Sequence, residues 1–449
     1  MFLRAPCLFL SLAGSYLRPA CAFPTLDHLE RLTGKEDLSA ESASAAFEKL
    51  QHDIKGRLEK RFLFDAMNTP VDVNGDHAFQ PPADGEQRGP CPGLNALANH
   101  GYVSRDGIVS LAEVVSAINE VYGMGVELAL VLGIMGVVWT GDPISLDPSF
   151  SIGKNDTAVH NALDDLQGIL GTPQGLVGSH NFIESDSSPT RDDLYVTGNN
   201  YAMNLSRFES WYNMVPEGES YTSEVMAEYA AKRFHETVAE NPYFYYGPFT
   251  GMIARNAGYL FITRLFANHS SEHPEGVLTA KAHDVIKSFF GVYGDKGSFT
   301  YREGWEQIPQ NWYKVPVDYG LIQLNLDTVD WILRHPELGS IGGNTGTVNS
   351  FAGVELTDLT SGVLNLAKLL ESNNLLCFVL EVVKLASPTY LNNLYATLSV
   401  PLNLLFDTLS VPLLNLACPT WKDLTYGGEP IWQALQERFP GANMSGAAL

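Results

Sequence analysis

The sequence predicts an all-α protein, a predominantly helical main domain followed by a helical C-terminal segment. Apolar residues recur at helical spacing through most of the chain, most clearly in segments 111–119 and 225–234, and the alternating runs typical of strands are few. The longest apolar run, 128–139, falls short of the ~20 residues that span a bilayer. We therefore expect this run to form a buried core helix and expect no stable membrane insertion.

The N-terminus has the features of a secretory signal. Arg4 precedes an apolar run at 7–13, and Ala20-Cys21-Ala22 offers a cleavage site between small residues. We expect residues 1–22 to be removed and the mature protein to be secreted; a buried N-terminal helix is the alternative. Four sequons are compatible with glycosylation after export, at Asn155, Asn204, Asn268 and Asn443.

The charge of the chain limits its partners. The formal net charge is −23 and the pI is about 4.8. Such an acidic chain is repelled by nucleic acid and by anionic membranes, so neither is an expected partner.

A glycine-rich stretch at 339–346 is the best candidate for a domain boundary. It separates a main domain, 23–338, from a leucine-rich segment, 339–449. In that segment the sequence Leu-Ser-Val-Pro-Leu occurs twice, at 398–402 and 409–413. The prolines predict short or kinked helices that pack on the main domain.

Removal of the signal would leave three cysteines, Cys91, Cys377 and Cys418. Cys377 and Cys418 lie in the same leucine-rich segment and would pair naturally in an oxidising compartment. Cys91 then remains unpaired, which points to a functional role for this cysteine. The alternative for Cys91 is an ordinary buried thiol.

Cys91 stands between Pro90 and Pro92. Pro92 suits the first position of a helix, because its missing N–H costs nothing there, and the residues after it favour helix. Cys91 is therefore expected at the N-cap, where free N–H groups and the positive end of the helix dipole point at its sulfur. This setting should lower the pKa of the thiol and favour the thiolate, which binds soft metals, haem iron included.

A second informative segment runs from 181 to 193. Glu184, Asp186 and Ser188 alternate in it, so in an extended conformation they would point to one side. Carboxylate, carbonyl and hydroxyl oxygens suit a hard cation such as magnesium. Taken alone, an acidic and serine-rich run is more often a solvated loop.

Together the two segments resemble the fungal haem-thiolate peroxidases, the family of chloroperoxidase and the unspecific peroxygenases. Residues 90–102 are similar to the proximal motif of that family nearly residue for residue, and 103–107 continue the match. Residues 184–193 stand where the family carries Glu-Gly-Asp or Glu-His-Asp, then a serine and an Arg-x-Asp. A looser likeness covers 64–268, and the C-terminal cysteine pair resembles that of the longer peroxygenases.

The resemblance implies that Cys91 is the axial ligand of a haem b. The sulfur of such a ligand favours O–O cleavage of peroxide. It implies that Glu184, the Ser185 carbonyl and the Ser188 hydroxyl hold magnesium beside a haem propionate. Ser185 replaces the glycine or histidine of the family, so a distal histidine at this position is absent.

The distal side departs further from the family. Its members place a glutamate above the iron to move a proton, often with an arginine seven residues earlier. Here those positions fall on Ala257 and Thr250, and no Asp or Glu occurs between 241 and 271. Three interpretations stay open: Arg255 or Asn256 polarises the peroxide, a carboxylate reaches in from elsewhere, or turnover is poor or different.

Aromatic residues gather around these segments. In the family such rings line a substrate channel, while at least half of them should be ordinary core. They are Phe182, Tyr243, Phe244, Tyr245, Tyr246 and Phe249.

The expected function is hydrogen-peroxide-dependent oxidation of small organic substrates, hydrophobic or aromatic, by a monomer or homodimer. The alternatives are halide oxidation on the same scaffold and a catalytically weak secreted haem-binding protein.

Overall fold

The structure is a computed structural model that describes residues 68–142, 148–159, 173–216, 218–278, 285–355 and 425–446, with the single residues 358, 369, 374, 375, 377, 378 and 448. The predicted signal, Cys418 and the two Leu-Ser-Val-Pro-Leu copies lie outside these residues.

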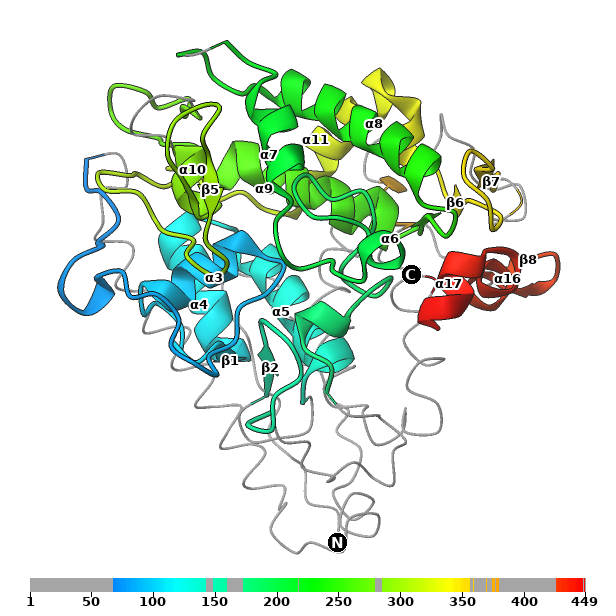
Figure 1. Ribbon diagram of the computed structural model, residues 1–449, viewed down its shortest axis with the longest axis horizontal. Helices are drawn as coiled ribbons and strands as arrows, with labels where there is room; N and C mark the ends of the chain where they lie inside the picture. Colours follow the sequence, from blue (N-terminus) through cyan, green and yellow to red (C-terminus); the bar gives the residue numbers. More distant parts are fainter. Residues whose placement is uncertain are drawn as a thin grey trace, which may run out of the picture.

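The described chain is rich in helix (Figure 1). Its α-helices are α3 (Pro92–Asn99), α4 (Leu111–Tyr122), α5 (Val126–Thr140), α6 (Leu194–Thr197), α7 (Leu205–Tyr212), α8 (Ser223–Glu240), α9 (Asn256–Leu265), α10 (Val285–Phe289), α11 (Leu321–Arg334), α16 (Ile431–Arg438) and α17 (Pro440–Ser445). Shorter helical turns are η1 (Gly75–His77), η3 (Leu176–Gly178), the π-helical η4 (Thr250–Arg255) and η5 (Pro336–Gly339).

Short strands interrupt this helical chain. They are β1 (Ile108–Ser110), β2 (Ser149–Ser151), β3 (Tyr245–Tyr246), β4 (Val292–Tyr293), β5 (Thr300–Tyr301), β6 (Gly342–Gly343), β7 (Ala352–Gly353), β8 (Thr425–Tyr426) and β9 (Glu429–Pro430). All pairs are antiparallel, and β6 lies between β3 and β7. The helix-rich part of the fold prediction is thus confirmed, although the described chain also contains small sheets.

Helices α4 and α5 form a packed pair beside α3. Ser110 begins α4 with a capping box, in which its hydroxyl accepts from the Glu113 N–H and the Glu113 carboxylate accepts from the Ser110 N–H. The predicted core helix at 128–139 is α5, which is apolar along nearly its whole length. Gly133 lets α5 approach α4 closely, because a Cβ there would lie 2.8 Å from Leu111 Cδ1.

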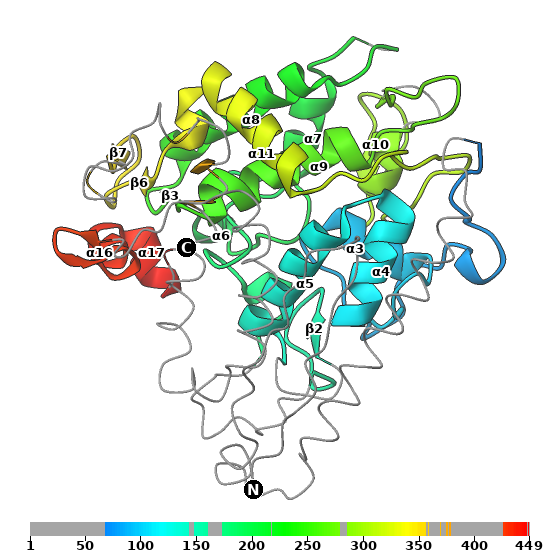
Figure 2. The same cartoon turned by 180° about the vertical axis from the view of Figure 1, so that it is seen from behind.

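Helices α8, α9 and α11 form the other large helical unit, with α7 beside them (Figures 1 and 2). The segment predicted as helical at 225–234 lies inside α8. A bidentate ion pair ties α9 to α11, since Arg264 donates to both oxygens of Asp327 at 2.8 and 2.6 Å.

The C-terminal helices α16 and α17 lie beside α6 in both views (Figures 1 and 2). The predicted boundary at 339–346 contains β6, the central strand of the sheet with β3 and β7. Cys377 is buried and disulfide-bonded, but its pairing with Cys418 stays a prediction. In the described part of the chain, no helix has the length and apolar character needed to cross a membrane.

Candidate functional site

Cys91 caps the N-terminus of α3, as the flanking prolines predict. Its backbone is extended, with φ −90° and ψ 107°, and Pro92 is the first helical residue. The backbone N–H groups of Gly93 and Leu94 interact with the sulfur. The side chain is partly exposed and is a free thiol. The helix start therefore presents one sulfur surrounded by backbone donors.

The expected lowering of the Cys91 pKa is wrong for the metal-free protein. Loss of hydration raises the pKa of this thiol, and this effect outweighs the lowering by the two N–H groups and by Arg191. The sequence shows the helix dipole but not how deeply the fold buries the sulfur.

The loop before Cys91 is fixed to α3. Asn95 both accepts from the Gly89 N–H and donates to the Gly89 carbonyl, at 3.0 Å each. The Tyr122 hydroxyl donates to the Gly93 carbonyl at 2.8 Å. A free thiol with backbone donors on such a braced turn fits the axial ligand of a haem.

The acidic segment does not have the extended form that the sequence suggests. Ser187 has φ 64°, in the left-handed region, and the chain bends there. Asp186 is buried and accepts from the Tyr245 N–H at 3.2 Å. The predicted extended conformation is therefore wrong, but Glu184 and Asp186 still lie beside the same residue, His180, with oxygens 2.7 and 3.8 Å from its ring nitrogens.

His180 is a buried residue of this segment that the sequence reasoning missed. Its Nδ1 lies 2.7 Å from Glu184 Oε2, and Asn200 donates to the same oxygen at 2.6 Å. Burial alone would lower the pKa of His180, but the carboxylates of Glu184 and Asp186 raise it to about 9. A histidine does therefore contact the carboxylate of Glu184, although position 185 lacks one. No periodic pattern pointed to this contact, because residues 180–184 form a turn and not a helix.

Two of the three predicted magnesium donors, Glu184 and Ser188, have partners within the protein. Glu184 Oε2 serves His180 and Asn200, and the Ser188 hydroxyl accepts from the Arg191 N–H at 3.3 Å. Among the described residues, no group of three or more His, Cys, Asp or Glu side chains is arranged to hold a metal.

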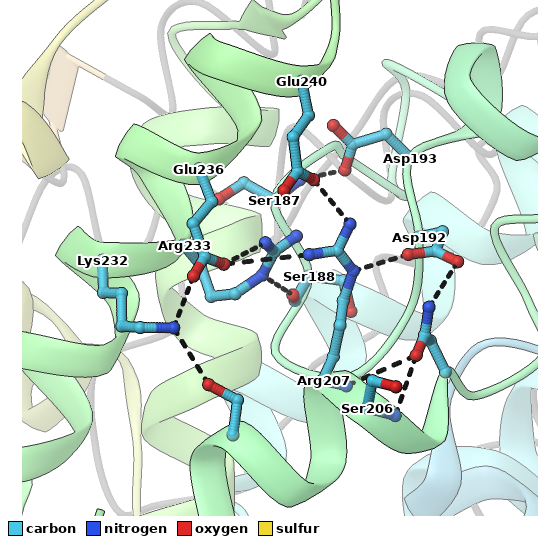
Figure 3. A network of polar contacts seen from close by, with 12 residues as sticks. Ser187, Ser188, Asp192, Asp193, Ser206, Arg207, Lys232, Arg233, Glu236 and Glu240 are labelled. Carbon is cyan, nitrogen blue, oxygen red and sulfur yellow. Dashed lines mark hydrogen bonds and ion pairs between the residues drawn. The ribbon is translucent and has the colours of Figure 1, made fainter.

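A polar network anchors the end of the acidic segment to α7 and α8 (Figure 3). Asp193 Oδ1 accepts from the Ser187 N–H at 2.8 Å. Arg207 of α7 joins Asp192 to Glu240 of α8, with contacts of 2.5 and 2.9 Å. Ion pairs from two helices thus fix a segment that has little regular structure of its own.

Arg255 and Asn256 lie where η4 passes into α9, and both are buried. Arg255 donates to the Ser187 carbonyl and hydroxyl at 3.1 and 2.8 Å, and to the Ala230 carbonyl at 2.6 Å. Asn256 accepts from the Tyr246 hydroxyl at 3.1 Å. These contacts hold the acidic segment against α9, as structural residues do. A catalytic role for either residue stays a prediction.

The aromatic residues divide between core and site. Phe244 and Tyr246 pack with Phe234 in a cluster of their own. Phe249 meets Trp139 edge to face, with ring centroids 5.9 Å apart. At least part of the predicted channel lining is therefore helix-packing core, as the alternative interpretation expected.

Comparison with known proteins gives a consistent result. The family described as "Peroxidase, family 2" matches residues 77–317, more than half of the chain. Aromatic peroxidase fscJ of Fusarium equiseti is 51% identical over 426 residues, which cover 94% of this chain and 95% of that protein.

Two further relatives are less similar. Dothistromin biosynthesis peroxidase dotB of Dothistroma septosporum is 40% identical over 79% of this chain and 83% of its own length. An aromatic peroxygenase of Coprinellus radians is 31% identical over 38% of this chain and 63% of its own. With Cys91 placed as the proximal motif requires, the chain belongs to the fungal haem-thiolate peroxidase family and is a haem-dependent peroxidase.

Proposed function

We propose that this protein is a secreted peroxidase or peroxygenase that uses hydrogen peroxide to oxidise small hydrophobic or aromatic molecules. The observation that carries the proposal is the free Cys91 thiol at the N-cap of α3, with the N–H groups of Gly93 and Leu94 at its sulfur. Relatives named aromatic peroxidase and aromatic peroxygenase support this substrate class. Halide oxidation on the same scaffold is the second candidate.

Residues around Cys91 prepare its sulfur to act as the haem ligand. A bound haem with a thiolate ligand would supply the chemistry that cleaves the peroxide O–O bond. Backbone N–H groups stabilise the negative sulfur, and Pro90 and Pro92 limit the movement of its backbone. The hydrogen bonds of Asn95 to Gly89 keep this turn in register with α3.

Spectroscopy of the Cys91 variants tests the proposal. The reduced CO adduct of the wild-type protein should absorb near ~450 nm, as thiolate ligation gives. Cys91→His should still bind haem but move this band to shorter wavelength, and should lose most peroxide-dependent oxidation of an aromatic substrate. Ser104→Ala, outside the α3 turn, is the matched control. Unchanged band and turnover in Cys91→His would reject the proposed ligand.

Export and glycosylation belong to the same proposal. Asn155 and Asn443 are exposed and accessible to a glycan. Asn204 instead donates through Nδ2 to Asp192 at 2.8 Å and caps α7 through Oδ1, so a glycan on Nδ2 would crowd the contact with Asp192. Intact-mass analysis of protein from a secreting host tests these sites and the signal at 1–22.

The structure gives the magnesium site at Glu184 and Ser188 less support than it gives the haem ligand Cys91. A cation at Glu184 and Ser188 would compete with the contacts that Glu184 makes with His180 and Asn200 and that Ser188 makes with the Arg191 N–H. Metal analysis of the purified holoprotein decides whether magnesium is present at one ion per chain.

A further inference from the structure

A buried pair of opposite charges lies on the flank of α3. Glu306 is fully buried (0% exposed), which raises the pKa of its carboxyl, while Arg191 and the side chain of Asn95 lower it. The Arg191 Nη2 lies 3.8 Å from Glu306 Oε1, and Arg191 is itself 3% exposed. A buried carboxylate is costly unless it is paired, so the place of this one beside a buried arginine calls for an explanation beyond packing.

Several contacts place this pair next to the Cys91 turn. The Asn99 side chain donates to the Glu306 backbone carbonyl at 2.8 Å, which holds the loop of Glu306 against α3. The amide of Asn95 lies close enough to the Glu306 carboxyl to act on it. Asn95 is one turn from Cys91, since its N–H donates to the Cys91 carbonyl at 3.1 Å. The carboxyl group is therefore beside the helix turn that begins at the sulfur.

The two charges act on the sulfur in opposite directions. The Arg191 guanidinium stabilises negative charge on the Cys91 sulfur, and the Glu306 carboxylate destabilises it. Both groups are buried, and charges in a protein interior are screened far less than charges in water. A change in either charge should therefore be felt at the sulfur.

We propose that Glu306 and Arg191 are positioning residues that set the reduction potential of the haem through its Cys91 ligand. The inference rests on the proposed function, because it requires iron bound to this sulfur. Adding an electron to the iron–thiolate unit makes it more negative. The Glu306 carboxylate opposes that change and so lowers the potential, whereas the Arg191 guanidinium favours it and so raises the potential.

Spectroelectrochemical titration of the ferric and ferrous holoprotein, at alkaline pH where the carboxylate form is favoured, tests the pair. Glu306→Gln should shift the potential upward and Arg191→Gln downward. The double variant should lie between them, close to the wild type. Glu303→Gln, an exposed carboxylate of the same loop, should leave the potential unchanged. Arg191→Lys, which keeps the charge, should remain closer to the wild type than Arg191→Gln.

The signs separate an electrostatic role from a structural one. General loosening of the site would move both single variants in the same direction, and that result, or no shift in either, overturns the proposal. The CO adduct of each variant is recorded in parallel. Wild-type protein without the thiolate band would reject the proposed function and this inference with it, whereas an intact band with unmoved potentials would reject only the charge pair.

Discussion

His100 is held as a neutral imidazole by two backbone groups. Its Nδ1 donates to the His77 carbonyl at 2.7 Å, and its Nε2 accepts from the Ile308 N–H at 3.1 Å. Protonation of Nε2 would remove that acceptor and place a charge in a site that is 2% exposed. Burial accordingly lowers the pKa of His100 to about 4.

The low pKa of His100 predicts a loss of stability in mild acid. In the unfolded chain this histidine titrates near ~6.5, so between about pH 6.5 and 4 the unfolded state binds a proton that the folded state does not. The stabilisation is complete above pH 6.5 and falls by about 3 kcal/mol toward pH 4. Urea unfolding at several pH values should show a shallower acid slope for His100→Gln than for the wild type. His235→Gln, an exposed histidine, should keep the wild-type slope, and equal slopes for all three proteins would contradict the prediction.

Single residues also show what the sequence can and cannot predict. The N-cap position of Cys91 follows from local proline chemistry, and the structure confirms it. The pKa of that thiol and the contact of Glu184 with His180 depend on burial and on a bend at Ser187. Both properties depend on tertiary structure, so they could not be predicted from the spacing of residues in the sequence.

At the scale of elements, α7 and α8 hold the acidic segment through Arg207. Its Nε donates to Asp192 and its Nη2 to Glu240, and its side chain is only 15% exposed (Figure 3). Asp192 is 17% exposed and Glu240 is 47% exposed, so the bond to Asp192 should contribute more than an exposed ion pair does. This Arg207 clamp, formed by the contacts of Arg207 with Asp192 and Glu240, should therefore contribute measurably to the free energy of unfolding.

Arg207→Gln should lower the free energy of unfolding by about 2 kcal/mol, because charge-assisted bonds to Asp192 and Glu240 are lost together. Lys232→Gln is the matched control in the same network, since that side chain is 44% exposed and pairs with a neighbour on its own helix. Its removal should cost less than about 1 kcal/mol. Chemical denaturation of both variants measures the difference, and equal losses would show that burial of the clamp is unimportant.

The long helices were predictable and the short elements were not. Periodic apolar residues indicated α4 and α8, a continuous apolar run indicated α5, and the structure contains all three. The strands β3 and β6 have two residues each and pair across nearly a hundred positions. Their formation depends on a distant partner, and the π-helical turn η4 has no periodic signature in the sequence.

At the scale of the molecule, the C-terminal end of the chain packs on the segment that carries Glu184. Asn181 donates to the Ser445 hydroxyl at 3.0 Å, and the Tyr245 hydroxyl donates to the Ala448 carbonyl at 3.2 Å. Gly441 permits this approach, because a Cβ there would lie 1.9 Å from the Tyr243 carbonyl oxygen. The leucine-rich segment was predicted to pack on the main domain, and its described end makes these contacts. The division into two domains stays a prediction.

Phe439, between α16 and α17, should be the main anchor of this end. It is fully buried and lies against Tyr245, with ring centroids 5.8 Å apart. Phe439→Ala removes a whole buried ring and should lower the free energy of unfolding by about 3–5 kcal/mol. Met444→Ala, in α17 but 55% exposed, should change it little.

Limited proteolysis distinguishes release of this end from a general loss of stability. Because Phe439 packs against Tyr245 of β3 and lies beside Gly343 of β6, its loss should open the contacts of α17 before those of α8 and α9. Phe439→Ala should then be cut first after residue 425, under conditions in which Met444→Ala and the wild type stay intact. Early cleavage within α8 or α9 instead would mean that the C-terminal helices and the helical core unfold as a single unit.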